Sequence, residues 1–150
     1  PRGNQEGASS MGDLLSQGWL NPSIGVPDID LIVPVPLHSR RERERGFNQA
    51  VLLAHRMGAN LGLSVADGVL KRTRQTRPQV GLSAQERRRN VDNAFQCVEP
   101  VLSGTQVLLV DDVCTSGSTL EAACRALREG GASLVWAYTL ARARIDASAT

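Results

Sequence analysis

Two adjacent carboxylates, Asp111 and Asp112, stand between a run of four apolar residues and a short stretch rich in hydroxyl groups. The apolar run, residues 107–110, is typical of a strand buried on both faces of a parallel sheet. Open α/β sheets bind their ligands outside the carboxyl ends of the strands. We therefore predict that the two acids bind a polar ligand rather than form a solvated turn.

The hydroxyl-rich stretch favours a phosphate as that ligand. It leads into a predicted helix, and the first N–H groups of a helix have no partner within the helix. These N–H groups, the positive end of the helix dipole and the hydroxyl groups together favour a bound phosphate. The residues expected to hold it are Thr115, Ser116, Gly117, Ser118 and Thr119.

The elements expected around these residues alternate between strand and helix. Strands are predicted at residues 31–35, 63–70, 95–101, 106–110 and 134–140, and helices at 47–61, 84–90 and 118–129. Ser83 with Glu86, and Ser118 with Glu121, have the spacing of a capping box at a helix start. The order of elements predicts an α/β fold in three layers, with a mainly parallel sheet flanked by helices.

A single domain is expected for a chain of 150 residues. Residues 31–142 should form its core, between a flexible or fragmentary segment at 1–30 and a tail at 143–150. The three cysteines lack Cys-x-x-Cys spacing, so a zinc site is not expected. No apolar run is long enough to span a membrane and no signal peptide is visible, which favours a cytoplasmic location.

The basic residues are distributed unevenly. Residues 40–89 hold 12 of the 17 Lys and Arg but only 4 of the 15 Asp and Glu, and Lys71 is the single lysine. Arginine binds phosphate groups in a bidentate way. A polyanionic ligand is therefore favoured over a merely solvated surface. Aromatic residues make up only 3% of the chain, which disfavours a stacking platform for single-stranded nucleic acid.

Residues 107–119 resemble the signature of the type I phosphoribosyltransferases that binds PRPP (5-phosphoribosyl-1-pyrophosphate), and the chain as a whole resembles the ComF family. The likeness extends over residues 31–142 and is carried by residues 33–38, 45–50, 79–83, 86–90 and 107–119. It implies a type I phosphoribosyltransferase fold and pentosyl transfer from PRPP to a nucleophile, with release of pyrophosphate. In that family the two acids hold the ribose 2′- and 3′-hydroxyls, and the loop holds the 5′-phosphate.

The resemblance also implies a pyrophosphate site and a cofactor. The loop after the first core strand and a mobile loop further along the chain are expected to contact pyrophosphate. Mg²⁺ is expected to bridge oxygens of PRPP without a direct protein ligand, with Asp111 and Asp112 reaching it at most through water. The candidates on the pyrophosphate side are Leu37, His38, Ser39, Arg40, Arg41, Arg72, Arg74 and Arg77.

Two alternatives to an enzyme of this kind stay open. The chain could be a non-catalytic PRPP- or nucleotide-binding protein that acts in DNA uptake, with DNA or a competence protein as the partner of its basic surface. An ATP or sugar-phosphate site of another class ranks last, because the sequence has neither a Gly-Lys pair nor a dinucleotide glycine motif after a strand. ComF proteins commonly carry an N-terminal four-cysteine zinc module, and residues 1–30 contain no cysteine. The sequence specifies neither the acceptor nucleophile nor the oligomeric state.

Overall fold

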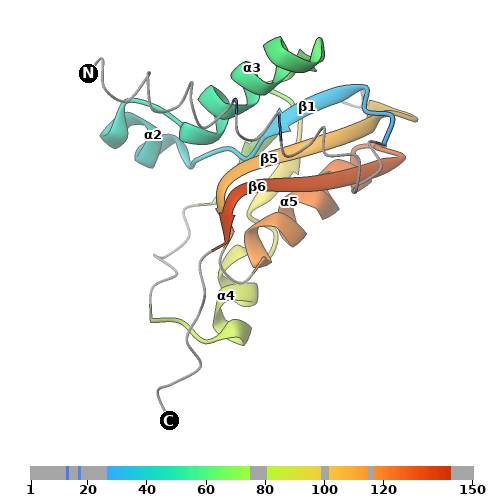
Figure 1. Cartoon of the computed structure of the whole chain (residues 1–150). Helices are drawn as coiled ribbons and strands as arrows, with labels where there is room; N and C mark the ends of the chain where they lie inside the picture. The colour runs from blue at the N-terminus through green and yellow to red at the C-terminus, as the bar shows by residue number, and fades with distance from the viewer. Residues whose placement is uncertain are drawn as a thin grey trace.

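A four-stranded parallel sheet lies at the centre of the molecule (Figure 1). The computed structural model describes residues 13, 17, 27–74, 81–98, 102–114 and 117–142. The strands lie in the order β2-β1-β5-β6, with bounds β1 (Leu31–Pro34), β2 (Ser64–Val65), β5 (Gln106–Cys114) and β6 (Leu134–Arg142). Every neighbouring pair in this sheet is parallel, which confirms the predicted mainly parallel arrangement.

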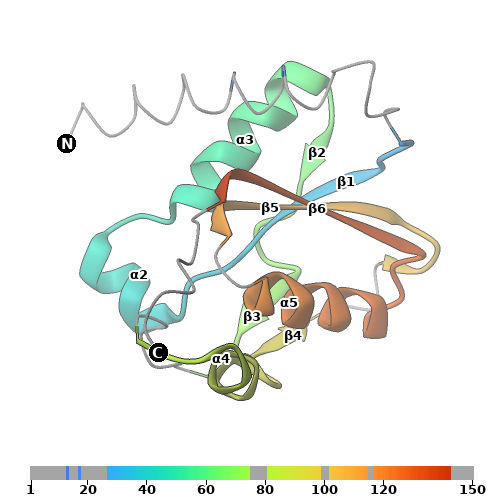
Figure 2. The ribbon, with the colours of Figure 1, turned by 60° about the horizontal axis from the view of Figure 1, so that its bottom comes forward.

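Helices cover the two faces of this sheet, as Figures 1 and 2 show. Helix α3 (Gln49–Leu61) lies on one face and α5 (Ser118–Glu129) on the other. Ile32 and Leu108 pack against α3, whereas Val33 and Leu109 pack in the cluster that contains α5. This division follows from strand geometry, because successive side chains point to opposite faces. Among the described residues, no helix is long and apolar enough to cross a membrane.

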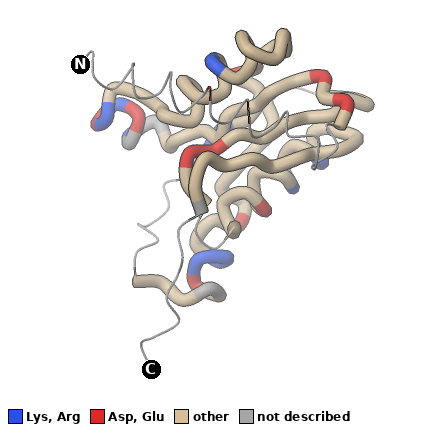
Figure 3. The backbone as a smooth tube through the Cα atoms, in the orientation of Figure 1, with Lys and Arg blue, Asp and Glu red and all other residues tan. Residues whose placement is uncertain are grey.

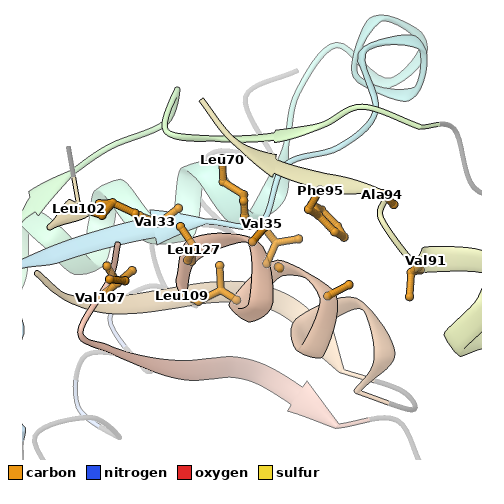
Figure 4. Packing of buried hydrophobic residues seen from close by; sticks show 14 residues of the cluster. Val33, Val35, Leu70, Val91, Ala94, Phe95, Leu102, Val107, Leu109 and Leu127 are labelled. Atoms are coloured by element: carbon orange, nitrogen blue, oxygen red, sulfur yellow. The ribbon is translucent and has the colours of Figure 1, made fainter. Parts of the chain in front are cut away.

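A small two-stranded antiparallel sheet lies beside α5. It consists of β3 (Leu70–Arg72) and β4 (Phe95–Cys97), and α4 (Ala84–Val91) lies between these strands in the chain. Figure 4 shows Leu70 of β3 and Phe95 of β4 in one buried cluster with Val35 and Leu109, which belong to the central sheet and its β1 end. The single strand predicted at residues 63–70 is therefore two strands in different sheets. β3 extends two residues past the predicted end at residue 70, to Arg72.

The connection from β1 to α3 contains a helix that the sequence did not predict, α2 (Ser39–Arg45). Gly46 ends it in a left-handed conformation, with φ of 76°. Asn48 then begins α3: its Oδ1 accepts the N–H of Ala50 at 3.0 Å, and its Nδ2 donates to the carbonyl of Val35 at 3.1 Å. Asn48 is buried, so this contact fixes the start of α3 to the end of β1.

The carboxyl edge of the sheet is uneven. β1 ends at Pro34, which pairs with Val110, whereas β5 and β6 stay paired as far as Cys114 and Arg142. The prediction that the signature strand ends at Val110 is therefore wrong, since pairing with β6 prolongs it. As a result, Asp111 and Asp112 lie on a two-stranded extension that passes the end of β1.

Candidate functional site

The acidic pair is held in place by the backbone of its own strand. The N–H of Asp112 donates to Oδ1 of Asp111 at 2.9 Å, and the N–H of Val113 donates to Oδ1 of Asp112 at 2.8 Å. Both acids are partly buried, and Figure 3 shows acidic residues along the tube of β5. Each carboxylate thus accepts a hydrogen bond from the backbone near the carboxyl edge of the sheet.

Asp111 sits in an environment that disfavours its charge. Burial is the main cause and the neighbouring carboxylate of Asp112 the second, and together they raise the pKa of Asp111 from 3.8 to about 7. The positive charge of Arg72 acts in the opposite direction. A second acid and a nearby cation are thus the two groups that control the charge of Asp111.

We expect the variant Asp111→Asn to be more stable than the wild-type protein at alkaline pH. The raised pKa means that the folded state keeps a proton which the unfolded chain loses at about pH 4, so stability falls as the pH rises towards about 7. Asparagine is neutral and removes this penalty. At about pH 8 the free energy of unfolding of Asp111→Asn should exceed that of the wild-type protein by roughly 4 kcal/mol.

Urea unfolding at about pH 4, 6 and 8 measures this effect. The two proteins should be nearly equal in stability at the acidic end and diverge as the pH rises. If the unfolding free energies of the two proteins differ by the same amount at every pH, Asp111 does not have the raised pKa described above.

The start of α5 forms the second part of the site. Gly117 is its N-cap, with φ of 80° and ψ of −8°, and the N–H of Glu121 donates to its carbonyl at 2.9 Å. No side chain caps this end, so the predicted capping box of Ser118 and Glu121 is wrong. Of the residues expected to hold a phosphate, Gly117, Ser118 and Thr119 lie at the helix start. Thr115 and Ser116 lie outside the described residues.

The acidic strand and the helix start are close because the chain between them is short. Only two residues separate Cys114 from Gly117. The five peptide links from Asp112 to Gly117 span at most about 19 Å between Cα atoms, at about 3.8 Å for each link. The carboxylates and the N-terminus of α5 can therefore contact opposite ends of one small ligand, such as a phosphorylated pentose.

The residues predicted on the pyrophosphate side after β1 lie where α2 begins. This segment, residues 37–41, follows the carboxyl end of β1 and so shares the sheet edge with the acids. Nδ1 of His38 accepts the N–H of Arg40 at 3.3 Å, which makes His38 the N-cap of α2. Arg40 is exposed and pairs with Glu44 at 3.0 Å. The side chains of Ser39 and Arg41 lie outside the described part, and pyrophosphate binding here stays a prediction.

The predicted cations of the loop after β3 have different surroundings. Arg72 belongs to β3, and Arg77 lies outside the described residues. Nη2 of Arg74 donates to the carbonyls of Arg89, Asn90 and Asp92 at 3.3, 2.9 and 2.8 Å. Because these carbonyls close the C-terminus of α4, Arg74 stabilises that helix. A contact of Arg74 with pyrophosphate stays a prediction.

Phe95 is a residue near the site that the sequence did not single out. It is the direct cross-strand partner of Arg72 in the two-stranded sheet of β3 and β4. The guanidinium carbon of Arg72 lies 5.3 Å from the centroid of its ring. Only the pairing register reveals this contact, and the sequence pattern of two short strands does not determine the register.

Comparisons with known proteins agree with this geometry. Residues 43–149 match the family model described as the phosphoribosyl transferase domain. The chain is 41% identical to the DNA utilization protein YhgH of Salmonella typhi over 137 residues, which cover 90% of this chain and 60% of that protein. It is 40% identical to competence protein F of Haemophilus influenzae over 116 residues, covering 76% and 51% of the two chains. The chain thus spans about half the length of these curated relatives.

Solved structures with a similar fold are phosphoribosyltransferases. The glutamine PRPP amidotransferase from B. subtilis matches with a TM-score of 0.61 and 21% identity, over 91% of this chain and 26% of that chain. Adenine phosphoribosyltransferase from Leishmania donovani matches with a TM-score of 0.54 and 15% identity, over 91% and 53%. At these identities the likeness shows the fold, and the predicted fold class is confirmed.

Proposed function

We propose, from the premise that the chain belongs to the phosphoribosyl transferase domain family and to its ComF-type members, that it binds PRPP and transfers the phosphoribosyl group to a nucleophile. The observation that carries the proposal is the short chain between the two acids of β5 and the start of α5, with only four residues between Asp112 and Gly117. It brings carboxylates for sugar hydroxyls close to backbone N–H groups for a phosphate.

The reaction follows from these contacts. The nucleophile attacks C1 of the ribose, the bond from C1 to the pyrophosphate oxygen breaks, and pyrophosphate leaves with the bonding electrons. Asp111 and Asp112 accept hydrogen bonds from the 2′- and 3′-hydroxyls, and their negative charge stabilises the cation-like sugar in the transition state. The N-terminus of α5 holds the 5′-phosphate at the far end of the sugar, so the reacting carbon is correctly positioned.

Mg²⁺ fits the donors that this site presents. Carboxylates are hard oxygen ligands, and Mg²⁺ is usually bound by one or two of them together with substrate phosphates. In the part of the chain that the structure describes, no three His, Cys, Asp or Glu side chains gather into a metal site. As the resemblance implies, Asp111 and Asp112 would hold the ion through water, with PRPP supplying the other oxygens. When bound, Mg²⁺ neutralises charge on the leaving pyrophosphate.

An assay of pyrophosphate release tests the proposed transfer. The protein is mixed with PRPP, Mg²⁺ and one candidate base at a time, and a mixture without a base measures hydrolysis. We expect release that depends on both the protein and a particular acceptor. Tight PRPP binding with no release for any acceptor would instead support a non-catalytic binding protein.

The names of the relatives and the charges of two helices favour a second candidate, DNA binding through a basic surface. On α2 and α4 the exposed basic residues are Arg40, Arg43, Arg45, Arg88 and Arg89. Figure 3 marks basic residues on both helices. If about three DNA phosphates are neutralised, affinity should fall roughly 40-fold between about 50 and 200 mM salt. Fluorescence anisotropy with a labelled oligonucleotide measures the DNA affinity at each salt concentration. An affinity that does not change with salt concentration would exclude this candidate.

A further inference from the structure

Asn48 is one of the two polar residues that are buried in the described part of the chain, and the other is Ser118. Its Oδ1 accepts the N–H of Ala50 at 3.0 Å, which is the bond that an N-cap residue makes. Serine or aspartate would cap the helix equally well. The Nδ2 group makes a further bond, because it donates to the carbonyl of Val35 at 3.1 Å. This second bond accounts for an asparagine at a buried position.

The carbonyl that Asn48 binds belongs to the residue that joins the end of β1 to the acidic strand. Val35 follows β1, and its N–H donates to the carbonyl of Val110 on β5 at 2.9 Å. Val110 directly precedes Asp111. Val35 is 4% exposed, so its carbonyl needs a partner within the protein. Asn48 supplies that partner, and Val35 is thus held between the start of α3 and the strand that carries the acidic pair.

The bond between Asn48 and Val35 joins the two ends of a loop of the chain. Residues 36–47 leave the sheet after β1, form α2 and return to α3, as Figure 2 shows. The segment predicted to contact pyrophosphate, residues 37–41, lies in the first half of this loop. A loop whose ends are joined has fewer conformations available than one whose ends are free. The Asn48 bond therefore restricts the segment that pyrophosphate is expected to contact.

The chain is also short where it leaves Val35. Only two residues, one of them Pro36, separate Val35 from His38, which is the N-cap of α2. The proline ring fixes φ of Pro36 and restricts the backbone of Val35 as well. Few rotatable bonds remain between the residue that is held and the start of α2. The position of Val35 beside β5 thus determines where residues 37–41 lie relative to the acidic pair.

We propose that Asn48 is a positioning residue for the pyrophosphate side of the site. By binding the carbonyl of Val35, it holds residues 37–41 at a fixed place relative to Asp111 and Asp112. Both polar atoms of its side chain make hydrogen bonds within the protein, and the residue is 7% exposed. Asn48 therefore acts through Val35 and does not contact the ligand itself. The inference rests on the proposed function and adds a residue to which the sequence pattern assigned no role.

Titration calorimetry of Asn48→Ser with three probes and Mg²⁺ tests this role. The probes are inorganic pyrophosphate, PRPP and ribose 5-phosphate. Serine keeps the helix cap but lacks the amide NH₂ group that binds Val35. We expect affinity for pyrophosphate and for PRPP to fall by the same factor, about fivefold for one neutral hydrogen bond. Affinity for ribose 5-phosphate should stay the same, because its expected contacts are the acidic pair and the start of α5.

The matched control is Asp30→Ser, which removes a bond of the same kind at the other end of the sheet. Oδ2 of Asp30 accepts the N–H of Gln106 at 2.8 Å, and this bond joins the chain before β1 to the first residue of β5. The control should bind all three probes as the wild-type protein does. A loss of pyrophosphate affinity in the control as large as in Asn48→Ser would show that lower stability, and not the position of the loop, is the cause.

Two results for Asn48→Ser overturn the inference: an equal loss of affinity for all three probes, or unchanged affinity for pyrophosphate and PRPP. If the wild-type protein binds none of the probes, the proposed function fails, and amide hydrogen exchange without a ligand decides on Asn48. The N–H of Glu42 in α2 donates to the carbonyl of His38 at 3.1 Å. It should exchange faster in Asn48→Ser than in the wild-type protein or in Asp30→Ser. Equal exchange in the three proteins would show that Asn48 does not hold the loop.

Discussion

The variant Asp111→Asn/Asp112→Asn should lose measurable PRPP binding and keep its fold. Each carboxylate is expected to accept a hydrogen bond from a ribose hydroxyl, and bonds to charged groups contribute roughly 1.5–3 kcal/mol each. Losing both therefore predicts an affinity at least about 100-fold weaker. The fold should survive because neither acid belongs to a buried cluster, and asparagine preserves the shape of each side chain.

Calorimetry with PRPP and Mg²⁺ measures the loss, and circular dichroism checks the fold. The matched control is Asp28→Asn/Glu129→Gln, which removes two negative charges from exposed positions. Asp28 precedes β1 and Glu129 ends α5, so both lie away from the carboxyl edge of the sheet. The control should bind PRPP normally. Unchanged affinity in the double asparagine variant would exclude the acids from the site.

The second large effect is expected at Gly117. Its φ of 80° lies in the left-handed region, where a β-branched side chain is strongly disfavoured. A Cβ atom at this position would meet no atom within 4 Å, so backbone strain and not a steric clash decides the result. Gly117→Val should move the start of α5 to another conformation. A strain of about 1–2 kcal/mol in the left-handed region drives this change, so PRPP binding should weaken by roughly 5- to 30-fold.

Two further variants show whether backbone conformation is the cause. Gly117→Asn should bind better than Gly117→Val, because asparagine tolerates the left-handed region. Gly68→Ala should bind as the wild-type protein does, since Gly68 has a negative or extended φ and open space around its Cα. Calorimetry with PRPP gives the order of affinities. Equal affinity for all Gly117 variants would show that the start of α5 does not hold the ligand.

The unit of β5, loop and α5 could be predicted from the sequence because its pattern is local and strong. Four buried apolar residues, two acids and a glycine before a helix leave few alternatives, and α5 begins at Ser118, one residue before the start that a cap at Ser118 would give. The capping box at Ser83 and Glu86 was predicted as well, and both of its hydrogen bonds are present. Such interactions depend on residues close in the sequence.

Features that depend on distant residues could not be predicted. The extension of β5 past Val110 requires pairing with β6, whose residues lie 28 positions later in the chain than their partners in β5. The same reason applies to Arg72, whose position over Phe95 depends on the register of β3 and β4. Helix α2 was missed for another reason: its seven residues are nearly all charged, so no apolar periodicity marks them. Ser118 was taken as a cap because serine commonly caps helices, but Gly117 takes that place.

Amide NMR signals of the ¹⁵N-labelled wild-type protein, followed during a PRPP titration with Mg²⁺, test most directly whether one ligand bridges the two parts of the site. The signals of Asp111 and Asp112 on β5 and those of Gly117, Ser118 and Thr119 on α5 should shift together and saturate at one shared Kd. A folded protein in which only one of these two groups shifts, or in which neither does, would contradict the account.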